Sequence, residues 1–341
     1  MSTGVLLINV GTVDAPTPDA VGRYLRQFLM DPFVIDIPAP LRWFLVNLMI
    51  VPRRKYRSAE AYQKIQTPEG SPLLVHTRAL AARLAAKLAQ GDSNYVVEYG
   101  MRYGNPSIKS ALETLAANEV SRILVMPLYP QYAGSSFETA IVETRLRARE
   151  LGCEKLLTFL PPFFDEPGFI SAYADGIRQA THDQPPEHFV FSFHGVPVRH
   201  LKRLHGNDGR CLSTQNCCAE ITSNNANCYR AQCFATARAI ANELELNNGD
   251  YTICFQSRLG RAEWIGPNTV SVLQEIANRG VKRIAVVCPS FVADCLETIE
   301  EMGLRGRETF IEAGGQEFTL VPSLNSSASW VNALTNQLRK A

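Results

Sequence analysis

Thiols are concentrated in one segment of this chain. Five of its nine cysteines lie in the stretch GRCLSTQNCCAEITSNNANCYRAQC, residues 209–233. Such thiols can close disulfides or bind a metal, because four thiolates suffice for a zinc ion or an iron–sulfur centre. The odd cysteine total, and an N-terminus without the positive region of a signal peptide, argue against a disulfide framework. We therefore expect free or metal-bound thiols. The five residues are Cys211, Cys217, Cys218, Cys228 and Cys233.

An imidazole and three carboxylates form a second group of residues that can do chemistry. His194 directly follows the apolar run FVFSF, and three acidic residues follow the run RIAVVCPSF. If a helix begins near the first of them, all three share one side of it. Such a stripe suits hydrated cations or proton relay, and an opposing imidazole suits a first-row metal or general base catalysis. The alternative is a structural histidine and an N-cap aspartate with solvated glutamates. The acidic residues are Asp294, Glu297 and Glu301.

The elements that must position these side chains alternate along the chain. Nearly continuous apolar runs are typical of strands buried on both faces of a parallel sheet. Amphipathic stretches such as 77–90 and 232–246 lie between them. This alternation predicts right-handed βαβ units in an α/β fold. Ligands of such folds bind off the carboxyl ends of the strands, where His194 and the acidic stripe lie. The predicted strands are 5–10, 122–128, 189–193, 252–257 and 283–289.

The two halves of the chain resemble each other. SRILVMPLYPQYAGSSFETA (121–140) and KRIAVVCPSFVADCLETI (282–299) share one plan. In each, a strand ends at proline, and a loop leads to a helix that opens with Glu-Thr. We therefore expect two related α/β lobes, with a boundary within LPPFFDEPGF (160–169).

Charge and hydropathy argue against two classes of protein. The formal net charge is +1 and basic runs are short, so we expect no nucleic-acid partner. The most apolar helical segment, LRWFLVNLMIVP (41–52), is too short to span a membrane and contains Arg42 and Asn47. It is either a buried helix or one that lies at a membrane surface. Its apolar lip would consist of Trp43, Phe44, Leu45, Leu48 and Met49.

Several motifs along the chain point to one family. FSFHGVP, FQSRLGRAEWIGP and CPSFVADCLETIEEM lie in the second half, and LLINVGT, EGSPLL, GMRYGNPSI and PLYPQYAGSS lie in the first. From about residue 4 to residue 335, their order and spacing resemble the ferrochelatase family, which inserts ferrous iron into porphyrin to make haem. The resemblance implies two similar Rossmann-like lobes of the type II chelatase kind, each a parallel four-stranded sheet flanked by helices.

The resemblance also implies domain boundaries. The first lobe is expected at 1–165, with a pocket lip at about 25–52. The second is expected at 166–325, with a cysteine-rich insertion at 206–233. A C-terminal helix at 326–341 is expected to pack back on the first lobe.

Roles for individual residues follow from the same resemblance. His194 is expected to face the porphyrin and to remove pyrrole protons or receive the metal. Glu297 is expected across the macrocycle, at the head of an acidic path with Asp294 and Glu301. His194 and Glu297 are thus the expected ligands of the substrate iron. Relatives often have histidine where this chain has Cys295, which puts any role of that position in doubt. The implied porphyrin-binding residues are Arg102, Tyr103, Tyr129, Ser136, Trp264 and Phe291.

The resemblance assigns the cysteine-rich insertion to the bacterial members that carry an internal [2Fe-2S] cluster. Four of the five cysteines would bind it, and structural zinc is the rival. Cys233 is similar to a cysteine found at that helix start in relatives without a cluster. The apolar lip is then expected to be partly exposed and to contact a membrane peripherally, in an otherwise cytoplasmic protein of open oligomeric state.

The expected reaction is insertion of Fe²⁺ into protoporphyrin IX to give protohaem, the terminal step of haem biosynthesis. Coproporphyrin III as substrate is one alternative, and another tetrapyrrole chelatase is a second. A two-lobed binding protein and an iron–sulfur redox sensor are more remote. The acidic stripe argues against the binding protein, and the sequence offers no DNA-binding or partner-binding module for a sensor.

Overall fold

A computed structural model describes residues 2–91, 94–204, 212, 216–258, 260 and 262–341 of the chain. The chain divides into two compact units, each with its own parallel sheet. The first unit contains Met1–Tyr129, Gly134–Pro162 and Asn325–Ala341, and the second contains Pro130–Ala133 and Phe163–Leu324.

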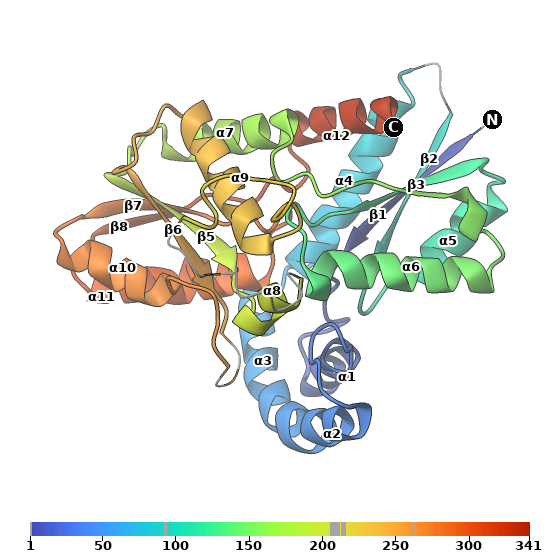
Figure 1. Ribbon diagram of the computed structural model, residues 1–341, viewed down its shortest axis with the longest axis horizontal. Helices are drawn as coiled ribbons and strands as arrows, with labels where there is room; N and C mark the ends of the chain where they lie inside the picture. Colours follow the sequence, from blue (N-terminus) through green and yellow to red (C-terminus); the bar gives the residue numbers. More distant parts are fainter. Residues whose placement is uncertain (1, 92–93, 205–211, 213–215, 259, 261) are drawn as a thin grey trace. The chain divides into compact units, whose positions relative to one another are not determined.

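The first unit is built on a sheet with the strand order β2-β1-β3-β4, and every pair in it is parallel. The central strand β1 is buried along nearly its whole length. Figure 1 shows α12 beside α4 and α5 beside α6. The strands are β1 (Thr3–Asn9), β2 (Tyr95–Met101), β3 (Arg122–Pro127) and β4 (Leu157–Phe159). The helices are α1 (Pro18–Leu29), α2 (Ala39–Phe44), η1 (Leu45–Ile50), α3 (Val51–Ile65), α4 (Pro72–Leu88), α5 (Ile108–Ala117), η2 (Gly134–Glu138), α6 (Thr139–Glu150), η3 (Glu154–Leu156) and α12 (Ala328–Lys340).

The second unit repeats this plan with the order β6-β5-β7-β8, again wholly parallel. Part of its core lies where Val190, Leu273 and Phe310 pack together. The helices α7 and α9 lie side by side, as do α10 and α11 (Figure 1). The strands are β5 (His188–His194), β6 (Tyr251–Gln256), β7 (Arg283–Val287) and β8 (Glu317–Leu320). The helices are α7 (Pro167–Thr181), α8 (Val198–Leu204), α9 (Tyr229–Glu243), α10 (Thr269–Asn278), η4 (Leu296–Gly306) and α11 (Arg307–Glu312).

The two parallel four-stranded sheets confirm the predicted fold class. The five predicted strands correspond to β1, β3, β5, β6 and β7. The other three were not predicted because they lack a continuous apolar run. β2 lies at a sheet edge and is only half-buried over most of its length, and β4 and β8 are edge strands of three and four residues.

Both units place a π-helix at the same point of the repeated plan. In the first unit β3 leads to η2 and then α6, and in the second β7 leads to η4 and then α11. A third π-helix, η1, lies between α2 and α3. π-Helical turns are rare and occur frequently at functional sites. We therefore expect functional residues in the segments after β3 and β7.

Candidate active site

The imidazole of His194 lies at the carboxyl end of β5, the second strand from one edge of its sheet. Its backbone is held from two sides. The His194 N–H donates to Ser290 Oγ at 3.3 Å, and the Tyr229 hydroxyl donates to the His194 carbonyl oxygen at 2.7 Å. The ring meets Phe291 edge to face, with centroids 6.0 Å apart. These contacts fix the direction of the side chain.

Burial favours the neutral form of this imidazole, which is the form that can accept a proton. It lowers the pKa of His194 because the charged form loses solvation, and the carboxylate of Glu297 opposes that shift only in part. The Nδ1 atom is buried and has no hydrogen-bond partner among the described residues. A neutral ring with an unused nitrogen can accept a proton or bind a metal.

Gly195 allows the ends of β5 and β6 to meet. Its N–H donates to the Gln256 carbonyl oxygen at 2.8 Å, and a Cβ added here would lie 2.7 Å from that oxygen. The same Cβ would come within 3.3 Å of the Trp264 ring. Pro197 then pairs with Trp264 in an antiparallel bridge. Only glycine permits this approach, which brings the indole beside the turn that follows His194.

The acidic residues lie before and within η4, which begins at Leu296 with Cys295 as its N-cap. The predicted helix start near Asp294 and the alternative of an Asp294 N-cap are therefore corrected by one or two residues. The Oδ1 atom of Asp294 accepts hydrogen bonds from Thr298 Oγ1 and from the Ser323 N–H, both at 3.1 Å. This carboxylate thus ties the start of η4 to the segment after β8.

Glu301 is bound by an unusual residue at the end of β6. The Ser257 N–H donates to Glu301 Oε1 at 2.9 Å, and Ser257 Oγ donates to Oε2 at 2.5 Å. Ser257 has a φ of +65°, which is uncommon for a residue other than glycine and is a form of strain found at functional sites. Burial raises the pKa of Glu301, and the Ser257 hydrogen bonds oppose that rise. Sequence reasoning missed Ser257, although its place directly after a buried strand was a usable signal.

A buried polar network supports the backbone of Glu297. Gln256 Nε2 donates to the Glu297 carbonyl oxygen at 2.9 Å, and Ser192 Oγ donates to Gln256 Oε1 at 2.8 Å. The hydroxyls of Ser192 and Thr269 also lie 2.8 Å apart. The Cys295 thiol is hydrogen-bonded to the Glu297 side chain, and burial together with that carboxylate raises the pKa of Cys295. Buried hydrogen bonds therefore hold the backbone of Glu297 in place. Its carboxylate is close enough to His194 to raise the pKa of that imidazole.

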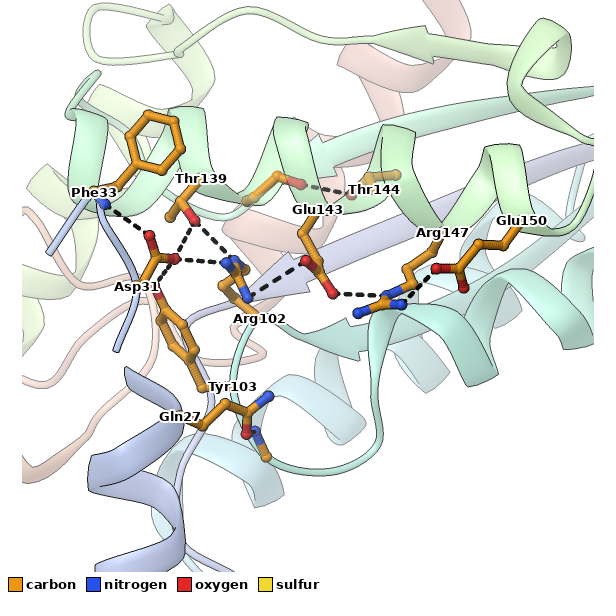
Figure 2. A network of polar contacts seen from close by, with 12 residues as sticks. Gln27, Asp31, Phe33, Arg102, Tyr103, Thr139, Glu143, Thr144, Arg147 and Glu150 are labelled. Carbon is orange, nitrogen blue, oxygen red and sulfur yellow. Dashed lines mark hydrogen bonds and ion pairs between the residues drawn. The ribbon is translucent and has the colours of Figure 1, made fainter. Parts of the chain in front are cut away.

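The first unit places Arg102 and Tyr103 directly after β2, but in a buried network rather than a vacant pocket. Figure 2 shows both side chains directed at Asp31. Arg102 Nη2 lies 2.5 Å and the Tyr103 hydroxyl 2.8 Å from Asp31 Oδ2. Thr139 Oγ1 accepts from Arg102 Nε at 2.9 Å and donates to Asp31 Oδ2 at 2.6 Å. Sequence reasoning missed Asp31, because it lies in a loop after α1 and in no strand-end motif.

Tyr129 and Ser136 follow β3 in the same unit. The Tyr129 side chain is buried, and its hydroxyl has no hydrogen-bond partner among the described residues. Burial raises the pKa of Tyr129, although the Arg102 charge opposes the shift. Ser136 lies in η2. The first unit therefore offers a buried hydroxyl near a guanidinium at its strand ends.

Comparison with known proteins decides which family these features belong to. A model of the ferrochelatase family matches residues 2–341. The chain belongs to the ferrochelatase family. A ferrochelatase of Coxiella burnetii is 46% identical over 338 residues, covering 99% of this chain and 93% of the relative. One of Bdellovibrio bacteriovorus is 45% identical over 340 residues, covering 98% of each. The chain is thus a metal-inserting lyase.

Solved chelatase structures share the fold of this ferrochelatase family member. The structure titled SirB from Bacillus subtilis with Fe3+ matches with a TM-score of 0.54 at 13% identity, covering all of this chain and 95% of SirB. At this identity the likeness concerns the fold alone. It agrees with the two Rossmann-like sheets expected from the sequence.

Thiols of this ferrochelatase family member gather at the start of α9. The Sγ atoms of Cys217 and Cys218 are 3.6 Å apart, and Cys218 is also hydrogen-bonded to Cys228. Arg230 Nη1 donates to Cys218 Sγ at 3.1 Å. Within the described ranges no group of three or more ligating side chains is arranged to hold a metal ion.

Of the remaining two cysteines of the predicted set, only Cys233 lies within the described residues. Cys233 is fully buried in α9, and burial raises its pKa well above the usual range. Cys211 lies outside the described residues, as does most of 205–215 in the predicted insertion 206–233.

The apolar lip is exposed, as expected for a surface helix and not for a buried one. Trp43 is 53% exposed and Phe44 50%. Leu48 and Met49 of the predicted lip are exposed to a similar degree, as is the neighbouring Leu41, whereas Leu45 is half-buried. The described part of the chain has no helix that is long and apolar enough to cross a membrane.

Proposed function

We propose that this chain inserts Fe²⁺ into protoporphyrin IX and releases protohaem. The observation that carries the proposal is the neutral imidazole of His194 beside the acidic residues of η4, in a chain of the ferrochelatase family. The reaction exchanges two pyrrole protons for one Fe²⁺ ion, so the site needs proton acceptors and a route for a dication. Both kinds of group are present at the strand ends of the second unit.

His194 accepts a pyrrole proton in this proposal. Its lowered pKa keeps the ring neutral near pH 7, which is the form that can act as a base. The contact with Phe291 orients the ring, and the Nδ1 atom is not used by a hydrogen bond within the described residues. Both observations support a ring that is available to a ligand.

Glu297, Asp294 and Glu301 form the acidic path. Carboxylate oxygens replace the hydration shell of the entering iron, and Glu297 binds it at the macrocycle. Neutral His194 is a second ligand only until its free nitrogen takes up a pyrrole proton. Glu301 has a raised pKa, so it takes up a proton at a higher pH than an ordinary glutamate. That property suits a group that passes on the protons released from the pyrroles.

The porphyrin contacts in this proposal are the residues that the family resemblance implies. Phe291 and Trp264 provide aromatic walls, supported by their places beside His194 and Gly195. Arg102, Tyr103, Tyr129 and Ser136 of the first unit are the other proposed contacts. Binding energy on the periphery of the ring can bend it and expose the nitrogen lone pairs to the metal.

The exposed apolar lip is evidence for a poorly soluble substrate and for contact with a membrane. Its exposed apolar residues are followed at once by the exposed Arg53, Arg54 and Arg57. An apolar face with adjacent cations is typical of helices that lie in the interface of anionic bilayers. This favours protoporphyrin IX over the more polar coproporphyrin III, which remains the alternative substrate.

The cysteine-rich segment is proposed to hold a [2Fe-2S] cluster, with structural zinc as the alternative. Two thiolates on one tetrahedral ion, with bonds of about 2.3 Å, lie about 3.8 Å apart. The 3.6 Å between Cys217 and Cys218 fits that geometry, and the Arg230 guanidinium compensates thiolate charge. Cys211, Cys217, Cys218 and Cys228 would hold the group. When bound, a cluster supplies a one-electron redox centre, with a structural or oxidant-sensing role.

An anaerobic insertion assay tests this function. Purified protein is mixed with Fe²⁺ and either protoporphyrin IX or coproporphyrin III, and the loss of porphyrin fluorescence is followed. We expect faster turnover of protoporphyrin IX. Preference for coproporphyrin III would replace the proposed substrate, and no turnover of either would remove the proposed reaction.

A further inference from the structure

One buried carboxylate in the first unit accepts four hydrogen bonds. Asp31 Oδ2 accepts from Arg102 Nη2, the Tyr103 hydroxyl and Thr139 Oγ1 at 2.5, 2.8 and 2.6 Å. Its Oδ1 accepts from the Phe33 N–H at 2.7 Å. The Asp31 side chain is 2% exposed, and Tyr103 is 1% exposed. Figure 2 shows the donors converging on this carboxylate.

We propose that Asp31 is a positioning residue for Arg102 and Tyr103, two of the side chains proposed to contact the porphyrin, an inference that rests on the proposed function. Asp31 lies between α1 and α2, in the segment that leads to the apolar lip. Arg102 and Tyr103 follow β2, and Thr139 begins α6. One carboxylate therefore joins the approach to the lip, the carboxyl edge of the sheet and the helix after η2. Asp31 therefore fixes the positions of Arg102 and Tyr103.

Charge makes the arrangement depend on Asp31. The Arg102 guanidinium has a second acidic neighbour, Glu143, but that carboxylate lies 3.8 Å away. Glu143 is already bound by Arg147 Nε at 2.8 Å, and Arg147 Nη1 binds Glu150 at 2.7 Å. Without the Asp31 charge, Arg102 loses its short ion pair, and Glu143, which already binds Arg147, does not replace it. A buried guanidinium and a buried phenol left without their shared acceptor must move.

A positioning role predicts a specific kinetic signature. Asp31 bonds to the side chains proposed to contact the porphyrin, whereas the acidic path for iron is in the second unit. Loss of the carboxylate charge should therefore weaken porphyrin binding and leave the KM for Fe²⁺ unchanged. General damage to the fold would lower the active fraction, and so kcat, without changing the KM for the porphyrin alone.

Three variants test the proposal. Asp31→Asn keeps the shape and removes the charge, and Thr139→Val removes the hydroxyl that bridges Arg102 and Asp31. Glu150→Gln is the matched control. Glu150 is the more exposed carboxylate that binds Arg147, at the far end of the chain of charged side chains that begins with Asp31 and Arg102. For each, the Kd of protoporphyrin IX is measured by fluorescence quenching, both KM values by the anaerobic assay, and Tm by thermal unfolding.

We expect Asp31→Asn to raise the Kd and KM for the porphyrin about tenfold, Thr139→Val about threefold, and Glu150→Gln not at all. The KM for Fe²⁺ should stay at the wild-type value. Folded Asp31→Asn protein with wild-type porphyrin affinity, or an equal rise in both KM values, would overturn the proposal. If Asp31→Asn does not fold, the same readings on Thr139→Val decide. Wild-type protein without turnover would remove the proposed function, while the porphyrin Kd values still decide the role of Asp31.

Discussion

At the scale of single residues, burial moves two titrating groups of the second unit in opposite directions. The pKa of His194 is lowered and the pKa of Glu301 is raised, in both cases because burial disfavours the charged form. The two pKa values therefore come closer together than in free side chains. The closer two pKa values are, the smaller the free-energy cost of passing a proton between the groups, which suits a site that must accept and release two protons.

Ser257→Ala should move the acid limb of the pH–rate profile to higher pH. The Ser257 hydroxyl favours the charged form of Glu301, so its loss raises the pKa of that carboxyl further, and the charged form is lost at a higher pH as pH falls. We expect kcat near pH 7 to fall by about ten- to a hundredfold, as for loss of one hydrogen bond to a charged group. Ser257→Gly is the control, since it loses the hydroxyl but relieves the positive φ. An acid limb that stays in place in both variants would contradict this role of Ser257.

Cys228→Ser should abolish the visible absorbance of the proposed cluster. Anaerobically purified wild-type protein should be coloured, with charge-transfer bands that fade on reduction. We expect Cys228→Ser to lose most of that absorbance and its iron, and the control Cys153→Ser, a buried cysteine of the first unit, to retain both. A colourless wild-type protein with stoichiometric zinc would rule out the cluster in favour of the alternative metal.

At the scale of elements, the site depends on how strands end. β5 and β6 can meet because Gly195 lacks a Cβ, and β7 leads into the π-helix η4, which carries the acidic residues. The repeated π-helix after β3 and β7 shows that the two halves share more than a sheet order. π-Helical turns occur frequently at functional sites, so η2 and η4 are a second structural reason to expect function at these two positions.

Gly195→Ala should damage the site more than the fold. The new Cβ would lie 2.7 Å from a backbone oxygen, which must shift. We expect a loss of about 1–3 kcal/mol in the free energy of unfolding and at least a tenfold loss of insertion rate. Gly176→Ala in α7 is the control, because its Cβ would meet nothing within 4 Å. That change should be neutral or stabilise by up to about 1 kcal/mol. Wild-type activity in Gly195→Ala would show that the close approach is dispensable.

The lip can be tested independently of the reaction. Trp43→Ser with Leu48→Ser removes two exposed apolar side chains, and we expect binding to anionic vesicles to fall at least tenfold in co-sedimentation. Val142→Ser on α6, also an exposed apolar residue, should have no effect. Equal binding by all three proteins would contradict membrane contact through the lip.

At the scale of the whole molecule, the sequence predicts what depends on continuous patterns. Buried strands, their alternation with helices and the repeat of the two halves follow from apolar runs, so the two-lobed α/β fold was predictable. Short or half-exposed edge strands carry no such run, and β2, β4 and β8 were not predicted.

Contacts between segments distant in sequence were the harder part of the site. Ser257 meets Glu301 across 44 residues, and Asp31 meets Arg102 across 71. No local pattern encodes such a contact, whereas the place of His194 after a buried strand was a local signal. The π-helical form of η4 also escaped prediction, because a spacing of four between Glu297 and Glu301 fits an α-helix as well.

The central claim is that His194 is the base of the insertion reaction, and one comparison tests it most directly. His194→Ala is measured against wild type for anaerobic Fe²⁺ insertion into protoporphyrin IX and, separately, for porphyrin binding by fluorescence quenching. We expect at least a hundredfold loss of turnover, of the size found for general base catalysis, with a porphyrin Kd close to wild type. Near-normal turnover by the folded variant would contradict it and remove His194 from the mechanism.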